Sequence, residues 1–342
     1  MTFALPAWRA SLLAAIVVCA GTGAMAQDKP TSPPINAAAT YQAAAEKGDA
    51  KAQTELAMIY LQGIGVLKDE GKALEWFTKA AEKGEARAQH QLGLMIGRGQ
   101  GTEQDYEKGR VWIEKAATAG YAPAQHALAQ LYRQGVGVQK DMTKAAEWFT
   151  KAADQGYALS QTCLGRAYRL GQGVQQDYKK ALDLFQKASA QDEPSGYYNL
   201  GYMYYKGWGV PQDYFQAEAN FRKAAVKGVD EAQNMLGVIY HRGDTGNRDL
   251  TQAAQWYRRA ADQGFGVAQM NLATLYRDGQ GVGKDVGEAY FWFSLAAKEN
   301  RTGADKQRDQ IAAQLPPAEL AEMNKRLSEW KPSNGISEGK DG

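Results

Sequence analysis

The sequence has little of what metal, redox and nucleic-acid chemistry require. It contains two cysteines and three histidines in 342 residues, and its formal net charge is +2. So few cysteines and histidines leave few places for metal ligands or a reactive thiol. A nearly neutral chain also lacks the basic surface that attracts nucleic acid or an anionic membrane. We therefore expect no metal, no cofactor and no nucleic-acid partner.

Long hydrophobic runs are also missing, apart from one near the N-terminus. There, Arg9 precedes an apolar run at residues 10–20, and Ala-Met-Ala at residues 24–26 has the small-x-small pattern of a signal-peptide cleavage site. The run is too short to span a bilayer. The pattern predicts a signal peptide, residues 1–26, cleaved after Ala26. The mature chain is then expected to be periplasmic or secreted, without a transmembrane span.

Cleavage would also limit the cysteine chemistry. Cys19 would leave with the signal peptide, so Cys163 would remain alone and no intramolecular disulfide could form. A valine precedes Cys19 where a lipoprotein signal has a small residue, which disfavours lipidation. We therefore expect the fold to be held by packing, and a redox role of Cys163 stays open.

What the sequence does contain is a repeat. A 36-residue period recurs seven times from Asp49 to Asn300 without insertion or deletion. Every repeat has leucine at position 8, glycine at position 15 and aspartate at position 21, and five have tryptophan at position 28. The predicted repeats are 49–84, 85–120, 121–156, 157–192, 193–228, 229–264 and 265–300.

The spacing within each repeat predicts two helices. Positions 5, 8, 9 and 12 share one face of a first helix, and positions 25, 28, 29 and 32 share one face of a second. In the connecting stretch "RQGVGVQKD", Gly135 is expected to cap the first helix, Gly137 to relieve the turn, Val138 to pack inward and Asp141 to cap the second helix. The loop lacks the GxxxxGK[ST] pattern and the third glycine that phosphate-binding loops require.

These residues carry a family resemblance. The stretch "ALSQTCLGRAYRLGQGVQQDYKKALDLFQKA" (158–188) contains most of the pattern AxxxLGxxYxxGxGVxxDxxKAxxWFxKAAxxG. It resembles the Sel-one-like repeat (SLR) family, which is related to the tetratricopeptide repeats, and the resemblance covers about three quarters of the chain.

The resemblance implies an all-α protein, a right-handed α/α superhelical solenoid of seven 36-residue helix-loop-helix repeats with N- and C-terminal capping helices. It also implies an adaptor or scaffold, and many bacterial members are exported to the envelope. A cysteine-rich branch of the family, in which each unit carries a disulfide, has been linked to β-lactam binding. This chain lacks those cysteines.

We interpret the flanking segments as caps, because the first and last repeats of such a stack each have a face that no further repeat covers. Residues 37–48 are predicted to form an N-terminal capping half-repeat, and residues 301–331 C-terminal capping helices. Residues 27–36 and 332–342 are polar or rich in proline and are expected to be disordered. The oligomeric state stays open.

The first helices are expected to line the concave surface of the stack. Their positions 3, 6, 10, 13 and 14 lie opposite the apolar stripe and vary between repeats, as a binding surface would. Tyrosines and arginines at these positions favour a partner that carries carboxylates, although such side chains could also be merely solvated or packed against neighbouring repeats. The candidate partner-binding residues are Arg133, Arg166, Arg169, Tyr198, Tyr202, Tyr205, His241, Arg242 and Arg277.

We therefore predict a non-catalytic, exported adaptor that binds an envelope protein or peptide. One alternative is binding or hydrolysis of a β-lactam or peptidoglycan fragment, but the Ser-x-x-Lys matches at 328–331 and 337–340 lack companion motifs. A second alternative is a secreted host-contact factor that uses Arg-Gly-Asp at residues 242–244. His90 and His126 share position 6, yet no carboxylate or thiol is evident beside them to complete a metal site.

Overall fold

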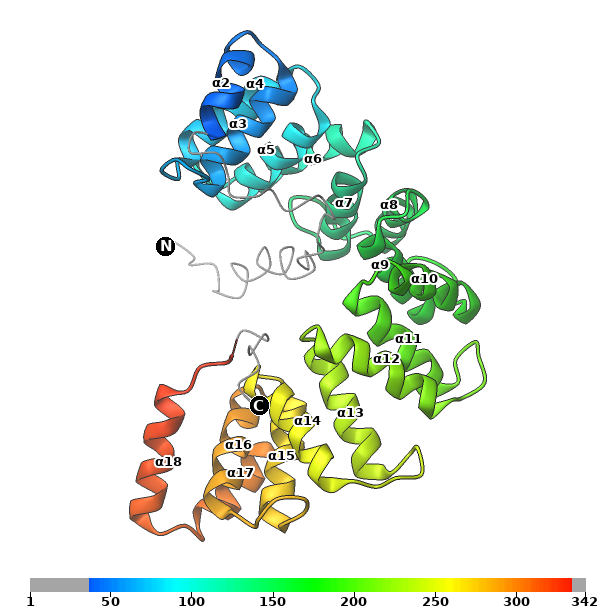
Figure 1. Cartoon of the computed structure of the whole chain (residues 1–342), viewed down its shortest axis with the longest axis vertical. Helices are drawn as coiled ribbons and strands as arrows, with labels where there is room; N and C mark the ends of the chain where they lie inside the picture. Colours follow the sequence, from blue (N-terminus) through cyan, green and yellow to red (C-terminus); the bar gives the residue numbers. More distant parts are fainter. Residues whose placement is uncertain (1–36, 334–342) are drawn as a thin grey trace. The chain divides into compact units, whose positions relative to one another are not determined.

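The computed structural model describes residues 37–333, and within that range the chain is α-helical without a strand (Figure 1). The predicted signal peptide, the 27–36 segment and residues 334–342 lie outside the described residues. The helices are α2 (Ala37–Glu46), α3 (Ala50–Gln62), α4 (Glu70–Glu82), α5 (Ala86–Arg98), α6 (Tyr106–Thr118), α7 (Ala122–Gln134), α8 (Met142–Asp154), α9 (Ala158–Leu170), α10 (Tyr178–Ala190), α11 (Pro194–Lys206), α12 (Tyr214–Val226), α13 (Asp230–Arg242), α14 (Leu250–Asp262), α15 (Gly266–Asp278), α16 (Val286–Lys298), α17 (Ala304–Ala312) and α18 (Pro317–Glu329).

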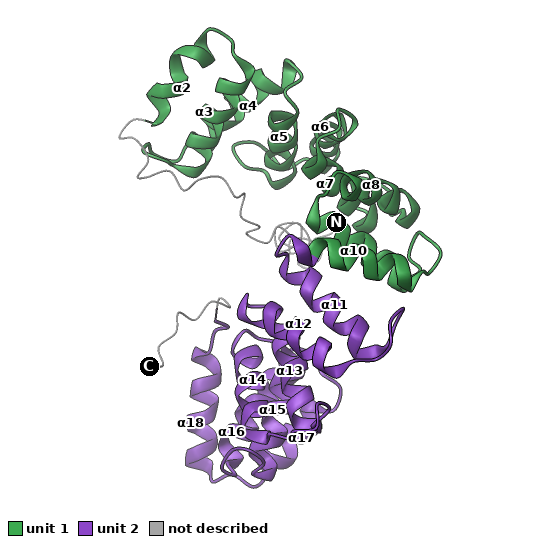
Figure 2. Ribbon diagram, turned by 45° about the vertical axis from the view of Figure 1, so that its right-hand side comes forward, with its two compact units in different colours: residues 1–188 green, residues 189–342 purple. Residues whose placement is uncertain are grey.

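The chain divides into two compact units, residues 1–188 and 189–342 (Figure 2). Each repeat supplies a first and a second helix, beginning with α3 and α4 and ending with α15 and α16. Within each unit, successive helices pack on one another in a solenoid-like stack. In the first unit α2 packs on α3, and in the second unit α17 and α18 both pack on α16. The predicted all-α repeat fold is therefore confirmed.

The apolar stripes interlock through small residues on the first helix and rings on the second. Gly165 stands at position 9, where a Cβ atom would lie 2.6 Å from the Phe185 ring, and Gly237 stands in the same relation to the Tyr257 ring at 2.5 Å. Phe185 is fully buried and Tyr257 is 2% exposed. The lack of a side chain at position 9 thus lets the two helices of a repeat approach each other closely.

The connecting loop has the predicted caps. Gly135 ends α7 in the left-handed conformation, with φ of 76°, and the Asp141 carboxylate accepts a hydrogen bond of 2.9 Å from the Lys144 amide at the start of α8. Val138 packs against the buried core of the first unit. The glycine and the aspartate therefore end one helix and begin the next.

Position 5 corrects the sequence interpretation, because it does not belong to the apolar stripe. It is a buried glutamine in six repeats, and each side-chain amide donates to a carbonyl oxygen eight residues earlier, at the end of the preceding second helix. The distance is 2.9 Å from Gln53 to Ala45 and 3.1 Å from Gln233 to Ala225. The last carbonyls of a helix have no partner within it, so these amides satisfy them. The glutamines are Gln53, Gln89, Gln125, Gln161, Gln233 and Gln269.

Candidate functional site: the first-helix face

The predicted binding surface consists of positions 3, 6, 10, 13 and 14 of the first helices, called here the first-helix face. Position 6 is mostly removed from the exposed surface. Its side chain is buried in five repeats, as Thr54, His90, His126, Thr162 and Asn234, and half-buried in the fifth repeat, as Tyr198. Of the five buried side chains, those of Thr54, His126 and Asn234 hydrogen-bond to residues of the next repeat. The variation at position 6 therefore reflects the fit between repeats.

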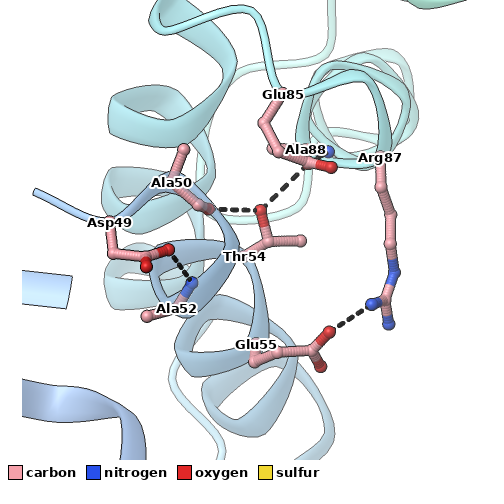
Figure 3. Close-up of polar contacts among 8 residues, drawn as sticks. All are labelled: Asp49, Ala50, Ala52, Thr54, Glu55, Glu85, Arg87 and Ala88. Atoms are coloured by element: carbon pink, nitrogen blue, oxygen red, sulfur yellow. Dashed lines mark hydrogen bonds and ion pairs between the residues drawn. The ribbon is translucent and has the colours of Figure 1, made fainter. Parts of the chain in front are cut away.

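The contact between α3 and α5 shows this arrangement (Figure 3). The Thr54 hydroxyl lies 2.8 Å from the Ala50 carbonyl oxygen and 3.0 Å from Glu85 Oε2, so its hydrogen is shared between two acceptors. Beside it, the Arg87 guanidinium forms an ion pair with Glu55 across the two helices. Polar side chains thus join neighbouring first helices.

A buried polar chain extends the pattern from α7 to α9. The Gln130 amide lies 3.3 Å from His126 Nε2 and 3.6 Å from Cys163 Sγ, and His126 Nδ1 lies 2.8 Å from the Ser160 hydroxyl. If Gln130 donates to Nε2, the proton of the neutral imidazole is on Nδ1 and is donated to Ser160. Each histidine nitrogen then has a partner.

Burial keeps the two position-6 histidines neutral. Desolvation, with a smaller contribution from Arg98, lowers the pKa of His90 to about 4. Desolvation, followed by electrostatic interaction with Arg133 and then with His90, lowers the pKa of His126 to about 3. A cation is unfavourable at these sites because water is excluded and the neighbouring groups are positive.

The pair of Ser160 and His126 does not have the geometry of an activated nucleophile. Ser160 is 0% exposed, so its hydroxyl cannot reach a substrate in this conformation. With the proton on Nδ1, its histidine partner donates a hydrogen bond to the hydroxyl instead of accepting one, and a pKa near 3 makes the imidazole a weak base at neutral pH. In residues 37–333 there is also no group of three or more metal-ligating side chains.

The three candidate arginines of the first unit differ in exposure. Arg166 on α9 is exposed, and Arg133 on α7 and Arg169 on α9 are half-buried. No carboxylate of the described part of the chain forms an ion pair with Arg133 or Arg166. Both guanidinium groups are therefore available to an anionic partner.

In the second unit, the candidate tyrosines of α11 continue into an aromatic row. The ring centroid of Tyr198 lies 6.2 Å from that of Tyr202, which lies 5.5 Å from that of Trp208 in the following loop. All three side chains are half-buried. The sequence interpretation missed Trp208, although tryptophan at this loop position occurs in no other repeat.

Tyr205 lies inside the unit and not on the row. It is 7% exposed, and its ring packs near Tyr214 and Phe221. Its hydroxyl donates to Asp244 Oδ2 at 3.1 Å and accepts from Arg242 Nη1 at 3.2 Å. Burial and the Asp244 carboxylate raise the pKa of Tyr205 to about 12 despite Arg242. Tyr205 therefore anchors the loop after α13 to α11.

The same contacts bear on the Arg-Gly-Asp tripeptide. The Asp244 side chain is only 11% exposed and lies 3.5 Å from Arg242 Nε, whereas the Arg242 side chain is 63% exposed. An adhesion receptor would have to bind the aspartate. The Asp244 carboxylate, however, already accepts a hydrogen bond from Tyr205 and pairs with Arg242. The exposed group here is the guanidinium.

The two remaining candidates already contact other side chains of the second unit. His241 is half-buried near Tyr257, and desolvation followed by the Arg248 charge lowers its pKa. Arg277 makes two hydrogen bonds to Asp278, of 2.7 and 2.8 Å, and a third of 2.7 Å to Gln307 on α17. Arg277 therefore connects α15 to α17.

Together, the paired helices and this mixture of buried and exposed polar residues define a helical-repeat scaffold. The Sel1 repeat model matches residues 50–85, 86–121, 122–157, 158–193, 194–229, 230–265 and 266–300. Each matched segment begins one residue after the repeat boundary predicted from the sequence. The chain belongs to the Sel1 repeat family, whose helical scaffolds typically bind proteins.

Comparison with solved structures agrees with this assignment. The chain is 32% identical to a Sel1 repeat protein from Oxalobacter formigenes, with a TM-score of 0.65, over 89% of this chain and 87% of that one. It is also 32% identical to c5321, described as a protective antigen of uropathogenic Escherichia coli, with a TM-score of 0.49 over 85% and 71% of the two chains. No curated protein matches the sequence. None of the described helices is long and apolar enough to cross a membrane.

Proposed function

We propose that this protein is an exported, non-catalytic adaptor that binds an acidic segment of an envelope protein on the first-helix face of its second unit. The observation that carries the proposal is the half-exposed row of Tyr198, Tyr202 and Trp208. Rigid aromatic side chains of this kind supply much of the binding energy at protein interfaces. The export signal and the envelope location are parts of the proposal that rest on the sequence.

Charge beside the row supports the choice of an acidic segment. The Lys206 ammonium lies 5.8 Å from the Tyr202 ring centroid, and the Arg242 side chain is 63% exposed. The acid beside Arg242, Asp244, is largely buried and already bound to Tyr205. The surface therefore presents cations to solvent while the compensating carboxylate faces inward, which favours a partner with carboxylates.

The test is photocrosslinking in intact cells with a benzophenone amino acid at position 202. A matched control carries the same probe at Trp112, a half-buried aromatic residue on a second helix of the first unit. We expect one protein to be crosslinked from position 202 and not from position 112. We also expect Trp208→Ala to reduce that product at least tenfold while the melting temperature stays nearly unchanged. Equal crosslinking from both positions, or no effect of Trp208→Ala, would contradict the proposal.

The β-lactam alternative has its own test. Labelled penicillin should leave the purified protein unmodified, because Ser160 is buried and Ser328 donates its hydroxyl to the Lys325 carbonyl on an exposed helix. Stoichiometric acylation measured by mass spectrometry would replace the adaptor proposal with an enzymatic one.

A further inference from the structure

Helix α12 carries an exposed apolar stripe on its outer side. Phe215 and Val226 are each 70% exposed, and Ala219 lies between them on the same face. Together with Glu218, Arg222 and Lys223 they line an open groove of about 560 Å³. A single exposed apolar side chain is ordinary, whereas apolar side chains gathered in one contiguous stripe often mark a surface that contacts a partner.

The stripe belongs to this repeat alone. Phe215 stands at position 23 and Val226 at position 34. In the other six repeats position 23 is glycine, glutamate, threonine or lysine, and position 34 is glutamate, threonine, aspartate, alanine or lysine. The repeat pattern therefore does not require apolar residues at these two positions.

The end of the second unit shows that a helix can cover this side of a second helix. Phe291 occupies in α16 the position that Ala219 occupies in α12, and it is fully buried. Helix α18 packs on α16, and the Arg326 guanidinium lies 3.9 Å from the Phe291 ring centroid. No helix of the described chain covers the corresponding side of α12.

We propose that a second copy of this chain covers α12, with the two α12 helices packed antiparallel about a two-fold axis. The stripe residues 215, 219, 222 and 226 are spaced by four, three and four, so the spacing is the same in both directions along the helix. An antiparallel copy therefore places Phe215 against the partner's Val226. It also places Ala219, whose small side chain permits close approach, against the aliphatic part of the partner's Arg222.

Charge supports a second copy as the occupant. In this register Glu218 lies beside the partner's Arg222, one residue from the position directly opposite. Within one chain, Arg222 Nη2 already lies 2.7 Å from Glu218 Oε1, and the Arg222 side chain remains 48% exposed. Glu218 of one copy can therefore also pair with Arg222 of the other copy. No unpaired like charges then face each other at the centre of the contact.

The small area of the contact limits its strength. A pair of helices of 13 residues buries less than the roughly 800 Å² per partner of a standard interface. We therefore expect a dimer with a dissociation constant in the micromolar range or weaker, which changes with concentration.

Sedimentation measurements of molar mass against concentration test this proposal. We expect the wild-type mass to rise from one chain towards two, and the double variant Phe215→Glu, Val226→Glu to weaken dimerisation at least tenfold. The matched control is Leu67→Glu, because Leu67 is 91% exposed in a loop of the first unit. A wild-type protein that stays monomeric at high concentration, or a control that weakens the dimer equally, would overturn the proposal. In the monomeric case the α12 face would be left to a different protein.

Cysteine crosslinking tests the direction of the helices. In a background with serine at positions 19 and 163, Phe215→Cys and Val226→Cys chains are mixed with a short bismaleimide. The antiparallel register predicts the mixed 215–226 product in at least fivefold excess over 215–215, because like positions are separated by 11 residues, or about 16 Å along the helix axis. Predominant 215–215 crosslinking would overturn the antiparallel arrangement. Neither experiment uses the first-helix face, so failure here is distinguishable from failure of the adaptor proposal.

Discussion

At the scale of the residue, His126 shows why variation at position 6 does not by itself mark a binding residue. Its side chain varies between repeats because each copy must fit the neighbouring first helix. In this copy the imidazole bonds to Ser160 on the following first helix, and its ring lies 5.4 Å from those of Phe149 and Tyr157. A variable residue in a repeat protein can therefore be part of an interface between repeats.

The buried histidines should make stability depend on pH. The pKa of His126 is lowered from 6.5 to about 3, so the unfolded chain takes up a proton below pH 6.5 that the folded chain does not. Stability is thus full above pH 6.5 and falls as the pH drops towards the folded pKa. We expect His126→Asn to remove about 1 kcal/mol of this loss at about pH 5.5. Asparagine already stands at the same position in the sixth repeat, as Asn234.

Urea unfolding of wild type and variant at neutral and mildly acidic pH measures the effect. The control is His241→Asn, since His241 is only half-buried and should change the pH dependence less. If the His126 variant loses stability with pH as steeply as the wild type, the imidazole is not neutral in the folded protein.

At the scale of the element, the loop between two helices also joins two repeats. Gly137 has φ of 64°, and a Cβ atom there would lie 2.7 Å from the carbonyl oxygen of Tyr106, the first residue of α6 in the preceding repeat. The Arg110 Nε atom donates to the Gly137 carbonyl at 3.1 Å. The second glycine of the loop therefore has two reasons to lack a side chain, the turn and the close approach.

The variants Gly84→Ala and Gly137→Ala distinguish the cost of the backbone conformation from the cost of the close approach. Gly84 has φ of 86°, but a Cβ atom there would meet no other atom within 4 Å, so Gly84→Ala reports the backbone cost alone. We expect Gly84→Ala to cost about 1 kcal/mol of unfolding free energy and Gly137→Ala about 3 kcal/mol or more. Chemical denaturation of both variants measures the difference. Equal costs would mean that the contact with α6 does not constrain the loop.

At the scale of the whole molecule, an array of repeats must cover the apolar faces at its ends. In the second unit this is the role of α17 and α18, and Arg326 contributes by lying over Phe291 and pairing with Glu288. Tyr290 adds a hydrogen bond of 2.8 Å to Asn324 on α18. The last repeat is therefore closed by polar contacts as well as by apolar packing.

Removing the Arg326 side chain should weaken this closure. We expect Arg326→Ala to cost about 1–2 kcal/mol, because it removes a cation over an aromatic ring and an ion pair with a carboxylate that is 20% exposed. Arg308→Ala on α17 should cost under about 0.5 kcal/mol, since the ion pair of Arg308 within residues 37–333 is with its exposed neighbour Asp309. Thermal unfolding of both variants compares them, and similar losses would show that α18 does not depend on this contact.

Much of this architecture follows from the sequence. The seven-fold period predicted the helix pairs, and the glycine and aspartate of the loop predicted the caps that Gly135 and Asp141 form. These features depend on residues close together in the chain. The binding residues were harder to predict, because the hydrogen bond that occupies the Tyr205 hydroxyl is accepted by Asp244, 39 residues away in the sequence.

The sequence by itself determined the repeat, its two helices and their caps, since helix periodicity and capping are local properties of the chain. Only the tertiary structure decided which polar side chains are free to bind. It turned the position-5 glutamines towards buried carbonyl groups, placed the position-6 histidines between helices and left the stripe on α12 in solvent. The physical reason is that exposure depends on which surfaces meet when repeats stack, and residues that occupy the same position in every copy meet different neighbours.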